Sequence, residues 1–316
     1  MMSNFAPIAM FVYNRFDNLT EVIASLKKNP EAINTEVFIF SDGAKGNSQV
    51  ENVKAVREYI NSLHGFKKIN IIERDENLGL ETNIVSGVNK VLELHDRVIV
   101  LEDDIVVSEK FLNYMNNSLK YYEDEPKVMH ISGYIDPIDT SEIASETFFI
   151  PTTSCWGWAT WKDRWQYYNN DASAILNNIE SRNLMSQFDF SNADVFRSQL
   201  LDNVFGVKST WAIKWMGSVF LQGGLCLHPK YTLTKNIGFG EGATNTKIIS
   251  RLYKEQKILD FHPKLSIIPH EVNRKAVESL QELYCYNGES STIKKNFVFL
   301  GKKVKRLIRD VKRKTN

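Results

Sequence analysis

Cysteine is scarce in this 316-residue chain, and no two cysteines are closely spaced. Cys155, Cys226 and Cys285 are odd in number and lie far apart, and no Cys-x-x-Cys pair occurs. Disulfide frameworks and thiolate metal sites need paired or clustered cysteines, so the sequence favours neither. We expect reduced thiols in a cytosolic protein.

Long apolar runs are also absent. No stretch approaches the roughly 18 residues that are needed to cross a bilayer. The first residues lack the basic region and apolar run of a secretory signal peptide, so we expect none. The composition, 43% hydrophobic and 24% charged, suits a soluble globular protein of one large or two small domains.

Two common nucleotide-binding motifs are missing. No Gly-x-Gly-x-x-Gly follows the first predicted strand, and the Gly-x₄-Gly-Lys-Ser/Thr pattern occurs nowhere. These absences argue against a dinucleotide-dependent dehydrogenase and against a P-loop enzyme.

Strand and helix patterns alternate over roughly the first 130 residues, which predicts an α/β fold with a mostly parallel sheet flanked by helices. Asp17 is expected to cap the first helix. The later residues 171–222 are expected to be helical, and 148–151 and 225–227 to form short strands. In the first part we expect strands at 7–12, 36–40, 68–72, 97–101 and 128–131, and helices at 18–28, 48–63, 79–94 and 108–122.

Three consecutive acids, Glu102, Asp103 and Asp104, follow the apolar strand that begins at Arg97. Adjacent carboxylates at a buried strand end repel one another and are costly without a cation. Hard oxygen ligands suit Mg²⁺ or Mn²⁺, which usually also hold substrate phosphates. A solvated acidic turn is the alternative interpretation.

Polar residues also follow the other predicted strands. Because parallel strands end at one edge of a sheet, where open α/β sheets bind ligands, these residues should line a common pocket. Arg15 is a candidate for a phosphate contact and Asp42 for a base or ribose contact, although each alone could be a helix cap or turn residue. The polar residues at the strand ends are Asn14, Arg15, Asp42, Asp75, Asn77 and the three acids Glu102, Asp103 and Asp104.

Tryptophan and glycine cluster in two later segments. Four of the six tryptophans lie within residues 156–165, where they form either a core or a surface that stacks on sugars. The glycine-rich residues 238–244 could close over a ligand.

The net charge of +1 hides a basic end. Residues 294–316 contain ten Lys or Arg and one acid, a charge of +9 that leaves −8 for the rest of the chain. Apolar residues recur there every three or four positions, which predicts a basic amphipathic helix. It could be a membrane-surface anchor, a docking helix or a disordered end; nothing else in the sequence supports nucleic-acid binding. The apolar residues are Phe297, Leu300, Val304, Leu307 and Val311.

Several of these pieces together resemble a known family. They are Tyr13-Asn14-Arg15, Ser41-Asp42-Gly43, Leu101 to Ile105, Trp156-Gly157-Trp158, and the run from His228-Pro229 to Asn236-Ile237-Gly238. In this order they resemble the GT-A-fold nucleotide-sugar glycosyltransferases, in particular the N-acetylglucosaminyltransferase I type and its bacterial relatives. The resemblance covers roughly residues 5–245.

The resemblance implies a metal-dependent, inverting transfer of a hexosyl or N-acetylhexosaminyl group from a nucleoside diphosphate, UDP above all, to an acceptor hydroxyl. It makes Asp104 the direct ligand of Mn²⁺ or Mg²⁺, and it places Trp156 and Trp158 at the acceptor. The nucleotide-sugar contacts that it implies are Tyr13, Asn14, Arg15, Asp42, Asn77, Glu102 and Asp103.

We expect the chain to be divided into a donor-binding half, an acceptor-binding half and a tail. Residues 1–135 would bind the nucleotide sugar, 136–293 would form the α-rich acceptor-binding and catalytic half of the same domain, and 294–316 would form the basic tail. The expected acceptor is a glycan or a lipid-linked oligosaccharide of bacterial surface-glycan synthesis. The tail would then hold a cytoplasmic protein peripherally on the anionic inner face of the membrane.

One position departs from the family. An Asp base is expected between two tryptophans, but the segment from Trp211 to Trp215 carries Ala212, which accepts no proton. Glu241 and Asp202 are the nearest alternative acids in the sequence. The glycine-rich loop also departs from the family, because it carries Gly240 and Asn245 where Asp and His are expected in bacterial relatives. A non-catalytic sugar-nucleotide or glycan-binding relative is therefore the second hypothesis, and a nucleotidyltransferase is the third.

Overall fold

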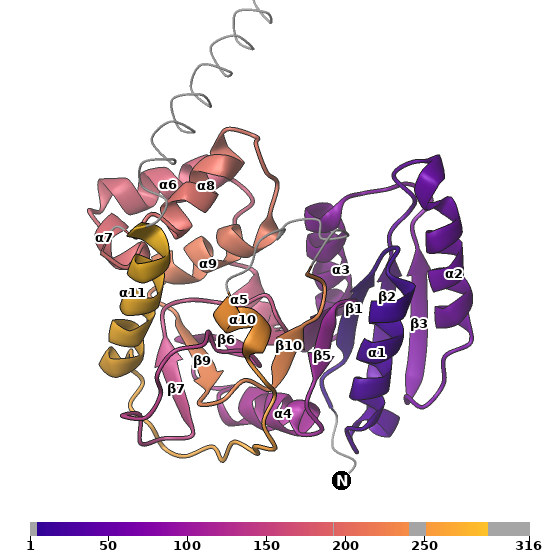
Figure 1. Cartoon of the computed structure of the whole chain (residues 1–316), viewed down its shortest axis with the longest axis horizontal. Coiled ribbons are helices and arrows are strands. Elements are labelled where there is room, and N and C mark those ends of the chain that lie inside the picture. Colours follow the sequence, from indigo (N-terminus) through magenta and orange to yellow (C-terminus); the bar gives the residue numbers. More distant parts are fainter. Residues whose placement is uncertain (1–4, 192, 240–250, 290–316) are drawn as a thin grey trace, which may run out of the picture.

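An eight-stranded mixed sheet, in the order β3-β2-β1-β4-β8-β6-β9-β7, forms the centre of the computed structural model (Figure 1). The structure describes residues 5–191, 193–239 and 251–289. A separate antiparallel pair joins β5 and β10. The strands are β1 (Ile8–Val12), β2 (Glu36–Ser41), β3 (Lys68–Glu73), β4 (Arg97–Glu102), β5 (Ile105–Val107), β6 (Val128–Ser132), β7 (Thr147–Ile150), β8 (Trp158–Trp161), β9 (Leu225–Pro229) and β10 (Thr234–Asn236).

Helices cover both faces of this sheet, and two short 3₁₀ turns precede β2 and α2. One face packs against α1, α2 and α4, and the other packs against α3 and α9. The helices are α1 (Phe16–Lys27), α2 (Val50–Asn61), α3 (Leu80–Leu94), α4 (Phe111–Tyr121), α5 (Lys162–Trp165), α6 (Ala172–Ser181), α7 (Met185–Phe188), α8 (Phe196–Val204), α9 (Trp211–Leu221), α10 (Arg251–Glu255) and α11 (Arg274–Glu289).

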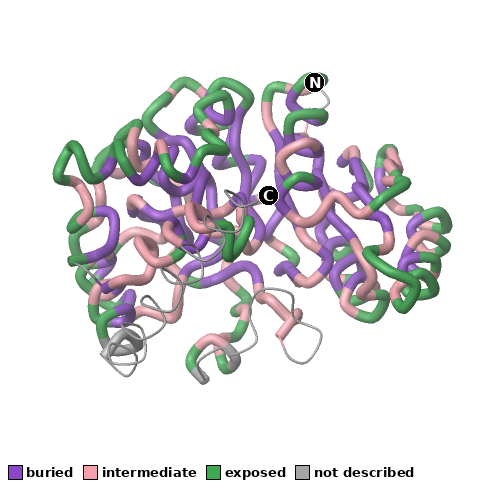
Figure 2. The backbone as a smooth tube through the Cα atoms, turned by 90° about the horizontal axis from the view of Figure 1, so that it is seen from above, coloured by how far each residue is buried: buried purple, intermediate pink, exposed green. Residues whose placement is uncertain are grey.

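The central strands have no exposed face, which explains their apolar sequences. In β1, Ile8 and Met10 point into the core under α1 and α4, while Ala9 and Phe11 point into the core under α3. This alternation is the period of two of an extended chain. Figure 2 shows buried segments gathered in the interior of the molecule and exposed ones at its periphery.

The predicted α/β fold with a mostly parallel sheet is confirmed, with two additions. β8 lies antiparallel between β4 and β6, and β7 runs antiparallel to β9 at the sheet edge. The sequence pattern predicted no strand at β8, because a tryptophan-rich run has no clear period of two. Since β7, β8 and β9 join the strands of the first 135 residues, both halves of the chain build one sheet.

Two local predictions change in detail. Asp17 does not cap the first helix, because α1 begins at Phe16 with Arg15 at its cap position, and Asp17 lies in the first turn. The helical prediction for 171–222 holds as four helices, α6 to α9. Residues with positive φ separate α6 from α8, among them Asn183 and Phe190. No described helix is long and apolar enough to cross a membrane.

The α-rich region stands to one side of the strands in Figure 1. Its helices α6, α8 and α9 pack on one another through Ile175, Leu200 and Ile213, all nearly inaccessible. A third cluster joins β7 to α11, with Phe148 and Ile150 against Leu280. These contacts fix α9 and α11 beside the sheet.

Candidate active site

The carboxyl ends of β1, β2 and β4 lie at one edge because the strands are parallel and in register. Val12 pairs with Ser41, and Phe11 pairs with Glu102. The polar segments that follow these strands therefore meet, as the sequence predicts for open α/β sheets.

Asp103 and Asp104 form the tight turn between β4 and β5. The backbone N–H of Tyr13 donates to Asp103 at 3.0 Å, and the guanidinium of Arg15 pairs with Asp104 at 2.6 Å. Both partners of this ion pair are mostly buried. The turn thus ties the end of β4 to the segment after β1.

The negative charges of Glu102, Asp103 and Asp104 repel one another. Burial and the neighbouring carboxylates raise the pKa of Asp103 to about 7 and the pKa of Glu102 well above its ordinary range. Burial also raises the pKa of Asp104, against the pull of Arg15. One nearby cation therefore does not compensate the cluster, and a second positive charge would be stabilised there.

The β5–β10 pair brings a distant backbone onto this turn. Asn236 pairs with Ile105, and the N–H of Ile237 donates to the carbonyl of Asp104 at 2.8 Å. A Cβ at Gly238 would lie 2.1 Å from a carboxylate oxygen of Asp104 and 2.7 Å from the Arg15 guanidinium. The backbone of residue 238 therefore lies against the acid–arginine pair, and no side chain fits there.

Asp42 organises the neighbouring loop. Its carboxylate accepts from the backbone N–H groups of Gly43, Leu78 and Gly79 and from the amide of Asn77, at 2.8 to 3.0 Å. These four bonds fill the acceptor positions of a carboxylate. Asp42 and Asn77 thus shape the loop before α3, and a nucleotide contact to this carboxylate would have to replace one of the bonds.

Tyr13 and Asn14 complete the segment after β1. The hydroxyl of Tyr13 accepts from the N–H of Lys45 at 3.0 Å and bonds Gln49, so its ring leans toward the loop after β2. Asn14 is half-buried beside Arg15. The first three expected nucleotide contacts therefore lie along the edge between Asp42 and Asp104.

The two expected acceptor tryptophans have different surroundings. Trp158 has an exposed fraction of 0% and stacks on Trp211 at 5.1 Å between ring centres, so its role as an acceptor surface is wrong. It belongs to the core under α3 and α9. Trp156 is half-buried, and its ring meets Tyr134 at 4.4 Å and Phe239 at 5.6 Å. Trp156 therefore remains beside the strand ends.

The expected position of the base lies at the start of α9. Ala212 is half-buried and packs against the tryptophan core. Nearby in sequence, Lys214 pairs with Glu81 of α3, which also accepts a hydrogen bond from the hydroxyl of Ser209. Glu81 therefore links α9 to α3, and its carboxylate is paired with the ammonium group of Lys214.

Asp202 and Glu241 are the two alternative acids for the base. Asp202 of α8 forms an ion pair at 3.5 Å with Lys208, which lies in the connection to α9. Glu241 lies outside the described residues, as do positions 240 and 245 and the whole tail 294–316.

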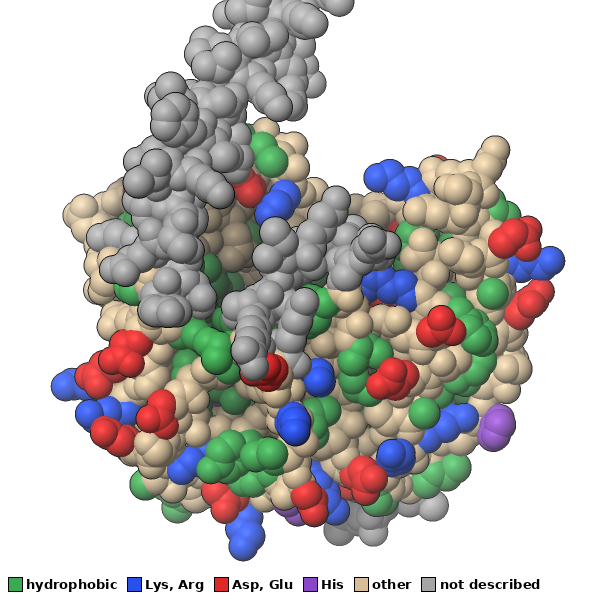
Figure 3. Space-filling view, viewed as in Figure 1, with side chains coloured by type: hydrophobic (Ala, Val, Ile, Leu, Met, Phe, Trp, Pro, Cys, Tyr) green, Lys and Arg blue, Asp and Glu red, His purple; other side chains and the backbone are tan. Residues whose placement is uncertain are grey.

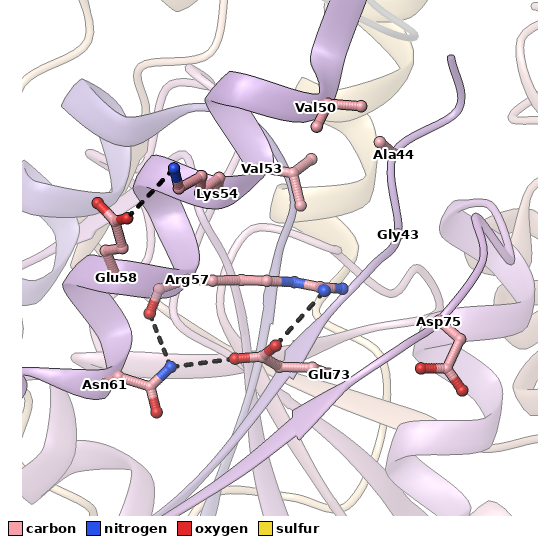
Figure 4. Close-up of a pocket in the computed structure, with 10 residues that line it drawn as sticks. All are labelled: Gly43, Ala44, Val50, Val53, Lys54, Arg57, Glu58, Asn61, Glu73 and Asp75. Atoms are coloured by element: carbon pink, nitrogen blue, oxygen red, sulfur yellow. Dashed lines mark hydrogen bonds and ion pairs between the residues drawn. The ribbon is translucent and has the colours of Figure 1, made fainter. Parts of the chain in front are cut away.

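A cavity of about 690 Å³ adjoins the ends of β2 and β3 (Figure 4). Its walls include Gly43, Ala44 and several residues of α2. Arg57 reaches across it to Glu73 at 3.4 Å, and Asn61 binds the same carboxylate at 3.0 Å. The cavity therefore lies beside the expected nucleoside contact Asp42, next to the loop after β2, and its Arg57 is held by Glu73.

Sequence reasoning missed one acid beside the site. Asp136 follows β6 and accepts hydrogen bonds from the hydroxyls of Tyr253 at 2.9 Å and Tyr284 at 3.1 Å. The rule that polar residues follow strand ends, applied to the predicted strand 128–131, would have found Asp136. Its tyrosine partners come from more than 110 residues away and carry no sequence signal.

The family model described as "Glycosyl transferase family 2" matches residues 8–179, more than half of the chain, including the ends of β1, β2, β4 and β6. The chain belongs to this family. It is a glycosyltransferase of the GT-A fold, as the sequence motifs imply; the N-acetylglucosaminyltransferase I type is a finer assignment that the match does not make. A search of curated proteins finds no match.

The chain is also similar to solved structures, among them the following two. One is the mannosyltransferase PcManGT from Pyrobaculum calidifontis in complex with GDP-Man and Mn²⁺, at 12% identity and a TM-score of 0.40, covering 70% of each chain. The other is S. aureus TarS, at 15% identity and a TM-score of 0.33, covering 49% of this chain and 28% of TarS.

Proposed function

We propose that this glycosyltransferase is metal-dependent and inverting, and that it moves a sugar from a nucleoside diphosphate to an acceptor hydroxyl in bacterial surface-glycan synthesis. UDP is the proposed nucleotide, and the sugar is a hexosyl or N-acetylhexosaminyl group. The observation that carries the proposal is the placement of Glu102, Asp103 and Asp104 together at the strand edge, where Arg15 is the cation that pairs with them among the described residues.

The residues present fit a divalent ion. No group of three His, Cys, Asp or Glu side chains among the described residues could enclose a metal by itself. Mg²⁺ and Mn²⁺ sites that hold substrate phosphates usually take one or two carboxylates and complete their shell with phosphate and water. We assign Asp104 as the direct ligand, with Glu102 and Asp103 holding metal-bound water, ribose or sugar.

The ion pair of Arg15 and Asp104 is then a resting arrangement. A diphosphate carries the charge that Arg15 prefers, because a guanidinium binds phosphate oxygens through its fork of N–H groups. Arg15 would turn to the phosphate and leave the Asp104 carboxylate free for the ion. When bound, that ion stabilises the negative charge that develops on the leaving diphosphate.

The other expected contacts are assigned to the two ends of the proposed site. Tyr13, Asn14, Asp42 and Asn77 lie toward the nucleoside end, and Trp156 lies toward the acceptor end. We propose that the half comprising residues 1–135 binds the donor and that residues 136–293 bind the acceptor. Ala212 still favours the alternative of a catalytically impaired or non-catalytic relative, which binds the donor without turnover.

A donor panel tests this function. We expect Mn²⁺ together with one of UDP-, GDP- or dTDP-sugars to raise the melting temperature of the full chain, because a ligand at about 100 times its dissociation constant adds about 2.7 kcal/mol to the free energy of unfolding. We also expect that donor to release its nucleoside diphosphate. Binding without release would favour the non-catalytic alternative, and no stabilisation by any donor would contradict the proposal.

The basic tail supplies a proposed partner, an anionic membrane surface that also carries a lipid-linked acceptor. Each Lys or Arg near such a surface contributes about 1 kcal/mol, and the attraction is screened at high salt. We expect the full chain to sediment with vesicles that contain phosphatidylglycerol and not with neutral vesicles. A chain ending at Thr292 should sediment with neither; equal sedimentation of both chains would exclude the anchor.

A further inference from the structure

Asp136 is a buried acid that the proposed donor site does not use. It lies four residues beyond the end of β6, at the same edge of the sheet as the other strand ends. Both of its carboxylate oxygens accept from tyrosine hydroxyls, one from α10 and one from α11. Two segments far along the chain therefore converge on this one carboxylate.

The tyrosine partners are fixed by packing. Tyr284 is nearly inaccessible and belongs to the apolar cluster that α11 forms with β7 and Ile135. Tyr253 packs on the same cluster, and Gln256 donates to the carbonyl of Ile135 at 2.7 Å. The carboxylate of Asp136 is thus held in a defined orientation.

A chain of ring contacts leads from Asp136 to the acids of the donor site. Tyr253, which binds Asp136, lies 6.3 Å from the ring of Trp156, and Trp156 lies 5.6 Å from the ring of Phe239. Phe239 follows Gly238, whose backbone lies against Asp104. Trp156, the expected acceptor contact, therefore lies between Asp136 and the Asp104 turn in this series of contacts.

A second observation brings the same groups together. The Cys155 thiol lies within electrostatic reach of Glu102, Asp104 and Asp136, and burial together with these carboxylates raises its pKa. Asp136 and the strand-end acids thus lie around residues 155 and 156. Ala212 has no carboxylate to accept a proton, whereas Asp136 has one.

We propose that Asp136 is the catalytic base that accepts the proton of the acceptor hydroxyl, an assignment that rests on the proposed function. The proton moves to the Asp136 carboxylate while the acceptor oxygen forms a bond to the anomeric carbon of the sugar. The bond from that carbon to the diphosphate oxygen breaks, and its electron pair leaves with the nucleoside diphosphate. Attack from the side opposite the leaving group inverts the anomeric centre.

The groups that face Asp136 support this chemistry. They are Tyr134 at the end of β6, Tyr253 of α10, Tyr284 of α11 and the Cys155 thiol. Burial raises the pKa of Asp136, and the two tyrosine hydroxyls oppose that rise. A base is most effective when its pKa approaches the working pH.

The test uses the full chain with Mn²⁺, a donor from the panel, and water or azide as the nucleophile. Asp136→Asn should lower nucleoside diphosphate release to water by about 10²-fold or more, the scale of general-base effects. Azide needs no deprotonation, so it should restore release and yield the glycosyl azide. Asp139→Asn removes an exposed acid of the same loop and should change nothing.

The pH profile separates a base from a structural support. Tyr253→Phe removes a hydrogen bond that favours the carboxylate, so the acidic limb of the wild-type profile should move to higher pH. Donor affinity by calorimetry should stay within about twofold of wild type for Asp136→Asn, because Asp136 is outside the donor site.

Other results would contradict either the assignment of Asp136 or the proposed function. Full release to water by Asp136→Asn, loss without azide rescue, or an unmoved acidic limb in Tyr253→Phe would overturn the assignment while leaving the proposed function intact. A gain of about 10²-fold from Ala212→Asp would place the base at α9 and overturn it as well. Failure of the wild type to release any nucleoside diphosphate would overturn the proposed function itself.

Discussion

Asp104→Ala is expected to lower sugar transfer about 10³-fold, the upper range for losing one group that stabilises a developing charge. The substitution removes the proposed metal ligand, although it also releases Arg15, which pairs with Asp104 at 2.6 Å, to the phosphate. The ion, and the leaving diphosphate whose charge it would stabilise, should therefore lose more than Arg15 can restore. The measurement is nucleoside diphosphate release from the best donor of the panel at saturating Mn²⁺.

Glu109→Ala is the matched control, because Glu109 is an exposed acid five positions along the same segment. It should keep wild-type release and wild-type melting temperature. Asp104→Ala should also keep its fold, since the acid turn carries more negative charge than Arg15 compensates. Equal release by Asp104→Ala and Glu109→Ala would remove Asp104 from the reaction.

Gly238→Ala is the second large effect. Its Cβ would lie 2.1 Å from an Asp104 oxygen, a distance that forces the acid turn, Arg15 or the backbone after β10 to shift. Overpacking of this kind costs about 1–3 kcal/mol, which corresponds to a loss of about 5- to 150-fold in an equilibrium constant. Because the shift displaces the proposed metal ligand and phosphate contact, we expect donor affinity to fall by a factor in this range, measured by calorimetry with Mn²⁺ present.

Gly46→Ala provides the comparison, because a Cβ at Gly46 meets nothing within 4 Å and its backbone needs no left-handed conformation. It lies in the loop after β2, near the expected nucleoside end. Unchanged affinity in both variants would show that the backbone at residue 238 does not border the donor.

Much of the central sheet could be predicted from the sequence because its strands are buried on both faces. The apolar runs of β1 and β4 and the acids after β4 are local signals. β8 was missed because Trp158 and Trp161 suit a core, a strand and a sugar surface equally. β5 and β10 have three residues each and owe their pairing to chain segments about 130 positions apart.

The site was predictable in location and less so in role. Strand ends placed Arg15, Asp42 and Asp104 at one edge, which is a consequence of parallel topology. The sequence could not show that Asp42 is occupied by the loop before α3, or that Arg15 and Asp104 pair across 89 positions. Such contacts depend on tertiary packing, and so does the burial that removes Trp158 from the acceptor surface.

The most direct test of the account is a calorimetric titration of the full chain with its best nucleotide sugar, with Mn²⁺ and again after chelation by EDTA. Because Arg15 alone does not compensate both the acids and a diphosphate, chelation should weaken binding by at least about tenfold, or about 1.4 kcal/mol. Equal affinity with and without the ion would contradict a metal site at Glu102, Asp103 and Asp104.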